Sequence, residues 1–121
     1  MTPPLSRLLI GRSGEQSAER FLSAKGLRLV ARNHRCVQGE IDLVMRDGDT
    51  LVFIEVRQRK NVDYGSPLET VSAAKQRKLI TAAQHFVASQ KISSRQALRF
   101  DVIGIVSNGS DETIEWIQNA F

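Results

Sequence analysis

The stretches that decide the fold are Gly39-Glu40-Ile41-Asp42-Leu43-Val44 and Phe53-Ile54-Glu55-Val56-Arg57. Both are apolar segments with acidic residues in the middle, where the core of a sheet ordinarily holds none. The Asp-Gly pair at 47–48 lies between them and is a strong short-range signal for a hairpin. We therefore predict that the two stretches are neighbouring antiparallel strands.

The acidic residues of this hairpin fall on one face in either of two registers. A two-residue loop at 47–48 places Glu40 opposite Glu55, whereas a four-residue loop at 47–50 places Asp42 opposite Glu55. Because side chains alternate along a strand, both loops put the same charged residues on one face: Glu40, Asp42, Glu55 and Arg57. The other face is apolar and consists of Ile41, Leu43, Met45, Val52, Ile54 and Val56.

Carboxylates that face each other across two strands destabilise the sheet unless something neutralises them. A divalent cation would do so. Mg²⁺ is bound by one or two carboxylates together with waters and substrate phosphates, which suits Asp42 and Glu55 with no His or Cys nearby. The alternative is a solvated sheet face on which the acids lie by chance, and the hairpin alone leaves both interpretations open.

Length and composition indicate one domain of ordinary globular character. The chain has 121 residues, of which 41% are hydrophobic and 25% charged. Lys and Arg number 17 against 13 Asp and Glu, which gives a formal charge of +4. This balance favours a polyanionic partner such as nucleic acid.

A single cysteine, Cys36, excludes an internal disulfide framework and any CxxC metal site, and it fits a reducing compartment. Leu8-Leu9-Ile10 is too short to span a membrane, and residues 1–12 lack the pattern of a secretory signal. We therefore expect a cytoplasmic protein with no membrane partner.

Residues 1–12 are predicted to form a flexible N-terminal arm, and residues 13–121 a single domain. Ser13-Gly14-Glu15-Gln16 fits a capping box, and Gly26 fits the residue just beyond the end of the same helix. Glu15 lies on the inner stripe of this helix. It can favour the helix dipole, or it can reach over the acidic face of the hairpin, and both interpretations stay open.

The rest of the chain reads as strands and one long helix. A capping box at Ser66-Pro67-Leu68-Glu69 and a second cap at Ser72 predict a short turn followed by a helix to about Ser89. Lys75 lies on the inner stripe of that helix. Further strands are expected at 27–33, 98–106 and 113–118. The predicted order is α-β-β-β-α-β-β, an α/β (α+β) fold with a mixed sheet flanked by helices.

A basic segment leaves the third strand. Three cations, Arg57, Arg59 and Lys60, lead into a long connection that contains Tyr64. Cations that meet phosphates and an aromatic ring that stacks on a base would suit nucleic acid. A flexible surface loop is the alternative.

Two histidines have no ligand partner at a recognisable spacing. His34 is flanked by polar and basic residues and is expected at the surface rather than as a ligand. His85 has no acidic or cysteine companion at ligand spacing, and we expect it to be structural.

The order of elements and several motifs resemble the restriction-endonuclease-like, or PD-(D/E)XK, nuclease superfamily. The match is best to an uncharacterised YraN-like bacterial family, which is similar to the small archaeal Holliday junction resolvases. It covers Gly11 to about Trp116. The motifs are Gly14-Glu15 with Ala18-Glu19, Gly39 to Val44, Phe53 to Arg57, Gly65-Ser66-Pro67-Leu68-Glu69, Lys75-Gln76-Arg77-Lys78 and Arg99-Phe100-Asp101-Val102.

The resemblance implies a site for Mg²⁺ or Mn²⁺ in which Asp42 and Glu55 hold the metal and Glu15 supports it directly or through water. Arg57 occupies the position of the signature lysine; a guanidinium cannot act as a base, although it can hold a phosphate. Lys75 could take over part of the role of the missing lysine. Nucleic-acid contacts are expected from Arg59, Lys60, Tyr64, Ser66, Arg77 and Lys78.

The sequence is compatible with three functions. The first is a metal-dependent DNA endonuclease that acts on branched or otherwise structured DNA, as a homodimer by analogy with the resolvases. The second is a nucleic-acid-binding module with a weakened site, which Arg57 keeps open. The third is a protein-interaction domain with an incidental acidic cluster. Four carboxylates gathered in the motifs favour the first over the third.

Overall fold

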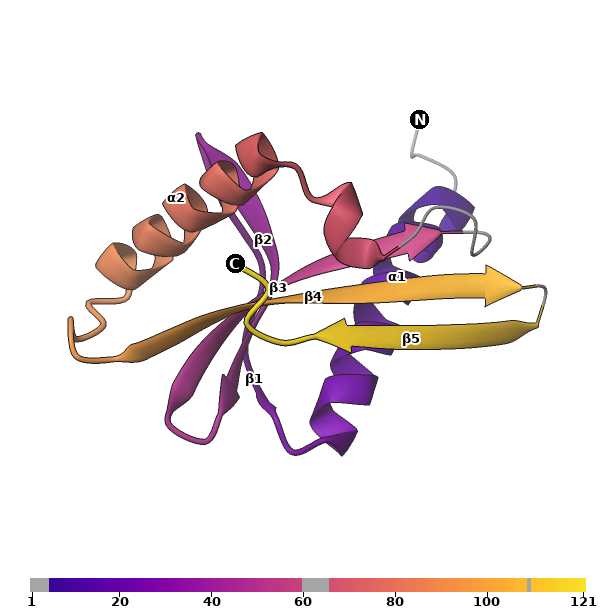
Figure 1. Cartoon of the computed structure of the whole chain (residues 1–121), viewed down its shortest axis with the longest axis horizontal. Coiled ribbons are helices and arrows are strands. Elements are labelled where there is room, and N and C mark those ends of the chain that lie inside the picture. The colour runs from indigo at the N-terminus through magenta and orange to yellow at the C-terminus, as the bar shows by residue number, and fades with distance from the viewer. Residues whose placement is uncertain (1–4, 60–65, 109) are drawn as a thin grey trace.

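A computed structural model describes residues 5–59, 66–108 and 110–121. Its elements follow the predicted order α-β-β-β-α-β-β, with one short helical turn added before the second long helix (Figure 1). They are α1 (Leu5–Ala24), β1 (Arg28–Cys36), β2 (Gly39–Asp47), β3 (Thr50–Arg59), η1 (Pro67–Thr70), α2 (Ala73–Ser89), β4 (Ala97–Asn108) and β5 (Asp111–Ile117). Lys60 and Tyr64, which the sequence assigns to a basic loop, lie outside the described residues.

The strands form one mixed sheet in the order β1-β2-β3-β4-β5. Neighbouring strands are antiparallel except β3 and β4, which are parallel and are connected through α2. Two parallel strands need such a crossover because the chain must return to the same end of the sheet before the second strand begins, and a tight turn cannot span that distance. The predicted mixed sheet flanked by helices is therefore confirmed.

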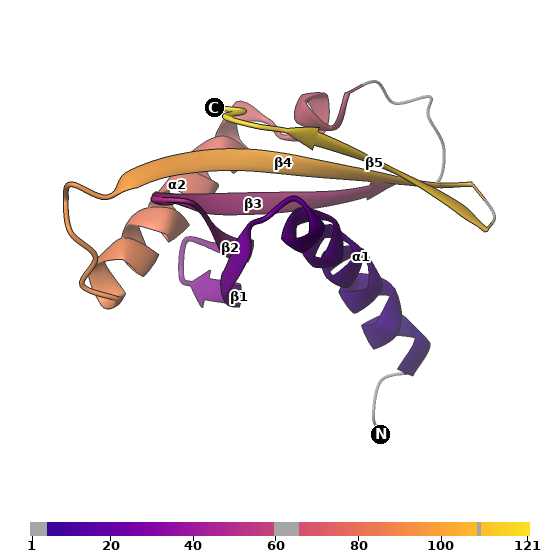
Figure 2. The same cartoon turned by 90° about the horizontal axis from the view of Figure 1, so that it is seen from below.

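The two long helices cover opposite faces of the sheet. Figure 2 shows α1 below β3 and β4, with η1 above them. One apolar cluster packs under α2 and contains Ile41, Val44, Leu51, Phe53, Leu79, Ala82, Ala83, Phe86 and Val102. The other packs under α1 and contains Ala18, Leu22, Leu43, Met45, Val52, Ile54, Ile103 and Ile105. Because both faces of the central strands are buried, β3 and β4 read as nearly continuous apolar runs.

The hairpin between β2 and β3 adopts one of the two expected registers. Arg46 pairs with Leu51, as the four-residue loop predicts, but the ladder continues to a pair between Asp47 and Thr50. The turn is therefore Gly48-Asp49, and Gly48 has a φ of 57°, which glycine adopts without steric strain.

The first helix begins earlier than the sequence predicts. It starts at Leu5, so the predicted start at Ser13 is wrong and residues 5–12 are helical rather than part of an arm. Leu, Arg and Ile dominate this segment and are adequate helix formers. Gly14 lies inside the helix rather than at its cap, and the side chain of Gln58 on β3 packs against it, so a Cβ there would require Gln58 to move.

Both predicted caps before the second long helix are confirmed. The Ser66 hydroxyl accepts the backbone N–H of Leu68 at 3.3 Å and begins η1. The Ser72 hydroxyl accepts the backbone N–H of Lys75 at 3.1 Å and begins α2. The second cap holds the first turn of α2 and with it the main chain of Lys75.

None of the helices in the part of the chain that the structure describes is long and apolar enough to cross a membrane.

Candidate metal centre

The pairing of β2 with β3 breaks at Asp42. The last ladder pair joins Leu43 to Ile54, and the next residue uses its side chain: Oδ2 of Asp42 accepts the backbone N–H of Val56 at 2.8 Å. Ile41 then packs in the α2-side cluster, although alternation predicted that it would share a face with Leu43. That part of the prediction is wrong because the irregularity at Asp42 interrupts the alternation.

Three carboxylates converge at this break. Glu15 comes from α1, and Glu40 and Asp42 come from β2; one oxygen from each lies within 4.8 Å of the other two. Glu15 lies in the middle of α1, well beyond the first turn, so the helix dipole does not account for it. The structure thus supports the interpretation in which Glu15 reaches the acids of the hairpin.

Glu55 lies beside this group without belonging to it. Continuing the hairpin register places Asp42 across from Glu55, whose side chain is only 7% exposed. One of its oxygens, Oε1, lies 3.9 Å from Nζ of Lys75 and 3.5 Å from Nε of Arg57. The structure therefore brings Glu15 and Asp42 together as predicted, adds Glu40 to them, and pairs Glu55 with two cations.

Burial and mutual repulsion disturb the ionisation of these acids. Burial raises the pKa of Glu55 to about 7, and the negative charge of Asp42 contributes next. Burial is likewise the largest cause that raises the pKa of Asp42, where the N–H of Val56 acts in the opposite direction. The pKa of Glu15 is also raised, first by burial and then by Asp42. Each anion is destabilised, so a cation bound among them would restore the charged forms.

The two basic residues near the site differ in their hydrogen bonding. The 3.5 Å contact between Arg57 and Glu55 is an ion pair without hydrogen-bond geometry, because the buried Nε of Arg57 has no hydrogen-bond partner within the described residues. Nε and Nη1 of Arg59 are also buried and unpaired there. Buried donors without a partner are uncommon in proteins.

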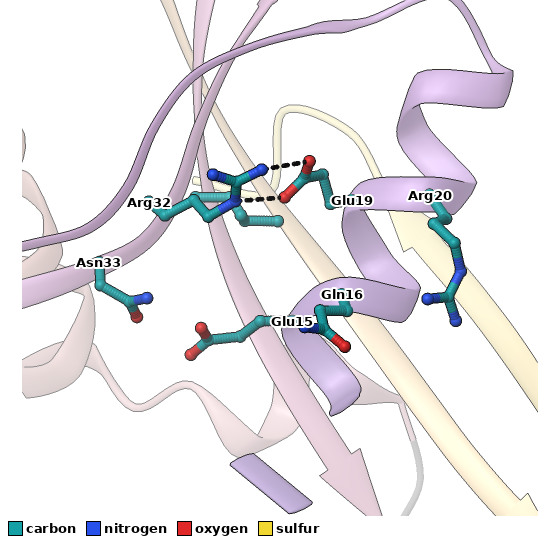
Figure 3. Close-up of a pocket in the computed structure, with 7 residues that line it drawn as sticks. Glu15, Gln16, Glu19, Arg20, Arg32 and Asn33 are labelled. Carbon is teal, nitrogen blue, oxygen red and sulfur yellow. Dashed lines mark hydrogen bonds and ion pairs between the residues drawn. The ribbon is translucent and has the colours of Figure 1, made fainter. Parts of the chain in front are cut away.

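A pocket opens beside the acidic group. It has a volume of about 460 Å³ and lies between α1 and β1 (Figure 3). The residues that line it are Glu15, Gln16, Glu19, Arg20, Arg32, Asn33 and Leu43. Arg32 donates two hydrogen bonds to Glu19, at 2.7 and 2.9 Å, whereas the Glu15 carboxylate extends toward Asn33. Glu15 therefore belongs both to the acidic group and to the wall of the pocket.

Sequence reasoning placed Glu40 on the acidic face but did not include it among the ligands. The signal that could have included it is the Glu-x-Asp spacing, which puts both carboxylates of β2 on one side. Asn33 has a left-handed φ of 51° and contributes to the pocket wall; asparagine tolerates this conformation, but nothing in the local sequence links it to Glu15.

The predicted nucleic-acid contacts are spread over several elements. Arg59 lies at the end of β3, Ser66 uses its hydroxyl to cap η1, and Arg77 and Lys78 are exposed on α2. The nucleic-acid contacts of these side chains remain predictions.

The donor set suits a hard divalent cation. Three carboxylates supply oxygen ligands, which Mg²⁺ and Mn²⁺ prefer, and the charge of Asp42 is close enough to Glu55 to raise the pKa of Glu55. The fold and this site together define a small α+β domain with a mixed sheet and a carboxylate-rich centre where its central hairpin separates. The chain belongs to the uncharacterised protein family UPF0102, whose profile matches residues 14–105.

Similar proteins occur in several bacteria. The chain is 49% identical over 111 residues to a UPF0102 protein of Stutzerimonas stutzeri, with 92% of each chain covered. It is 44% identical over 119 residues to a UPF0102 protein of Pseudomonas fluorescens, with 98% of each covered. A UPF0102 protein of Chromohalobacter salexigens is 50% identical over 107 residues, which cover 88% of this chain and 85% of the relative.

Proposed function

We propose that this protein is a metal-dependent endonuclease of the PD-(D/E)XK type that hydrolyses phosphodiester bonds in branched or otherwise structured DNA. The observation that carries the proposal is the convergence of Glu15, Glu40 and Asp42 beside a buried Glu55 that is paired with cations. Repulsion and burial make such a cluster of carboxylates unfavourable for folding unless a cation binds to it. The excess of basic residues supports a polyanionic substrate.

Asp42, Glu15 and Glu40 would hold the metal, and Glu55, which is paired with Arg57 and Lys75, would lie beside it. When bound, Mg²⁺ or Mn²⁺ would lower the pKa of the attacking water and polarise the scissile phosphate. The backbone N–H of Val56 orients the Asp42 carboxylate by donating to one of its oxygens. This hydrogen bond fixes the rotamer of Asp42 before any ligand arrives.

The basic residues act on the phosphate. The Arg57 guanidinium stays protonated, and it would donate to a phosphate oxygen and stabilise the charge that develops during hydrolysis. Lys75 approaches from the first turn of α2 and shares Glu55 with Arg57. We assign to Lys75 part of the role of the signature lysine. Unchanged cleavage by Lys75→Ala would remove that assignment.

Cleavage assays test the proposal. Linear duplex, single-stranded and four-way-junction DNA are incubated with Mg²⁺ or Mn²⁺ and with wild type, Asp42→Asn or Glu55→Gln. Asp49→Asn, an exposed residue in the hairpin turn, is the matched control. Metal-dependent cutting by wild type and the control that is lost in both site variants supports an enzyme. Cutting that persists in Asp42→Asn contradicts it.

The second candidate is a nucleic-acid-binding module that does not cleave. Arg57 favours it, because a lysine that can lose its proton is replaced by a group that cannot. Binding without cutting, preserved in both site variants, would identify this function. An RNA ligand bound more tightly than DNA of the same shape would redefine the substrate.

Two further parts of the proposal concern assembly and location. We infer a homodimer, since a duplex or junction presents two strands and the described part of one chain carries one acidic centre; sedimentation velocity measures this directly. A reducing, cytoplasmic location is our inference from the single cysteine.

A further inference from the structure

The pocket between α1 and β1 shares a wall with the acidic group formed by Glu15, Glu40 and Asp42. Its volume of about 460 Å³ lies in the lower part of the range that holds small organic ligands. Glu15 lines the pocket, and one of its oxygens lies within 4.8 Å of an oxygen of each of the other two carboxylates. A group attached to a phosphate at the acidic group can therefore reach this pocket.

The positive charges that line the pocket are already paired within the chain. Arg32 donates two hydrogen bonds to Glu19, at 2.7 and 2.9 Å. Nη2 of Arg20 donates to the hydroxyl of Ser17 at 3.3 Å. A phosphate inside the pocket would have to compete with Glu19 for Arg32, and it would lie beside the carboxylate of Glu15. The pocket therefore suits a neutral polar group better than an anion.

The lining offers a flat surface, a polar group and an apolar side chain. The two bonds to Glu19 hold the planar guanidinium of Arg32 at one side of the pocket (Figure 3). The amide of Asn33, which carries both donors and an acceptor, lies toward Glu15. Leu43 is 1% exposed and belongs to the α1-side cluster, so the apolar part of the lining is fixed. These features match a nucleobase, whose flat ring stacks on guanidinium planes and whose edge carries hydrogen-bond donors and acceptors.

We propose that this pocket holds one unpaired nucleoside of the DNA strand whose phosphate lies at the acidic group, with the base stacked on the guanidinium of Arg32 and its edge facing Asn33. The inference rests on the proposed function, because it takes the acidic group as the place where the substrate phosphate binds. It names the substrate class more closely. The substrate is DNA with an unpaired nucleotide, such as a bulge or the branch point of a flap, rather than a continuous duplex.

Base pairing decides which DNA can use the pocket. A paired base must first leave its partner and its stack, and this costs more free energy than moving a base that has no partner. The excess of basic residues attracts the phosphates of any DNA, so it adds affinity without distinguishing one structure from another. The pocket adds affinity only where an unpaired base can enter it. It therefore distinguishes structured DNA from a continuous duplex.

Fluorescence anisotropy with labelled DNA tests the proposal on the full-length protein in the presence of Ca²⁺, a cation that takes oxygen ligands. The probes are a paired duplex, the same duplex with a one-nucleotide bulge, and the same bulge with an abasic nucleotide; a gel afterwards checks that their strands are intact. We expect wild type to bind the bulge roughly tenfold or more tightly than either other probe, since only the bulge offers an unpaired base. Equal affinity for the bulge and the abasic bulge, or no binding to any probe, overturns the proposal.

Two variants test whether the preference for the bulge over the abasic bulge comes from the pocket. Arg32→Lys keeps the positive charge but removes the flat guanidinium. Asn33→Gly removes the amide, and glycine adopts the left-handed φ of 51° at this position without strain. Arg28→Lys, at an exposed position of the same strand that does not line the pocket, is the matched control.

We expect the preference to fall by roughly fivefold or more in each pocket variant and to stay unchanged in the control. The preference is a ratio of two affinities of one preparation, so a partly unfolded variant does not alter it. An unchanged preference in either pocket variant, or an equal fall in Arg28→Lys, overturns the proposal.

The binding assays and the cleavage assays can fail separately. A bulge preference that depends on Arg32 and Asn33, in a protein that cuts no DNA, would uphold the nucleoside pocket and contradict the nuclease activity. Metal-dependent cutting without any preference for an unpaired base would uphold the nuclease activity and overturn the nucleoside pocket.

Discussion

Two aspartates of the sheet, the buried Asp101 on β4 and the half-buried Asp42 on β2, differ in what surrounds them. The Asp101 side chain is 0% exposed and accepts two hydrogen bonds from Arg99, at 2.9 and 3.0 Å. It also accepts from Nε1 of Trp116 and from the backbone N–H of Asn119, both at 2.9 Å. Among the residues that the structure describes, Asp42 has one such donor, the N–H of Val56, and acidic neighbours.

The difference separates a structural carboxylate from one that is prepared for a ligand. Asp101 finds its counter-charge and its hydrogen-bond donors within the chain, so it holds the C-terminal residues against β4, where Phe121 also stacks on Phe100 with centroids 5.0 Å apart. Within the described residues Asp42 lacks a comparable set of donors; burial is the largest cause that raises its pKa, and repulsion from Glu40 adds to it. A partly buried charge with incomplete compensation is a frequent property of functional sites.

Replacing Asp101 should have the largest effect on stability. Asp101→Ala leaves the Arg99 guanidinium without its buried partner, and breaking a pair in this way lowers the free energy of unfolding by about 3–5 kcal/mol. Urea denaturation measures the change, with Asp111→Ala, an exposed residue, as the control. A change below about 1 kcal/mol would show that Asp101 does not stabilise the packing of the C-terminal residues against β4.

Replacing Asp42 should lower the affinity for metal and leave the stability of the fold unchanged. Asp42→Asn removes a charge from the acidic group, so we expect Mn²⁺ affinity to fall by about 100-fold, roughly 2.7 kcal/mol, with no loss of stability. Calorimetry with Mn²⁺ and urea denaturation test the two parts. A variant that binds Mn²⁺ like wild type, or that unfolds as easily as Asp101→Ala, would abolish the distinction between the two aspartates.

The raised pKa of Glu55 predicts a pH-dependent stability. The folded protein binds a proton at Glu55 up to about pH 7, whereas the unfolded chain releases it near the ordinary value of 4.5. The folded state binds more protons between these values, so the contribution of Glu55 to stability declines as pH rises from 4.5 to about 7.

Denaturation of wild type and Glu55→Gln across this pH range measures that contribution as a difference. We expect the stability of wild type relative to the variant to fall with rising pH, and saturating Mn²⁺ to offset the fall. A difference that is constant with pH would contradict the raised pKa.

The smallest expected effect is at Trp116. Trp116→Phe keeps the aromatic contact with Phe21, where the centroids are 6.2 Å apart, but removes the indole donor to Asp101. We expect a loss of about 1.5 kcal/mol, since a hydrogen bond to a charged group is lost while the other donors to Asp101 remain. Thermal unfolding of the variant beside Asp101→Ala tests this ranking, and a larger loss in Trp116→Phe would reverse it.

Local patterns predicted most of the fold. The order of elements, the hairpin and both serine caps follow from alternation, turn residues and capping preferences that act over a few residues. The start of α1 was wrong because a Ser-x-x-Gln match cannot distinguish a cap from the interior of a longer helix.

The candidate site was only partly predictable. Alternation placed Asp42 and Glu55 on one face, and the resemblance to a nuclease family added Glu15 and Lys75. Neither could show that Glu40 joins Glu15, that Glu55 is paired with cations, or that Ile41 changes face. These features depend on the side chain of Asp42 replacing a main-chain partner, which alternation does not encode.

By itself, the sequence determined the order of the strands and helices and that acids lie in the centre of the hairpin, because these properties depend on near neighbours in the chain. Only the tertiary structure decided which side chains meet. It brings together Glu15 and Asp42, His34 and His85, and Asp101 and Trp116 from separate elements. Contacts between distant residues depend on how whole helices and strands pack, and a local pattern carries no record of that packing.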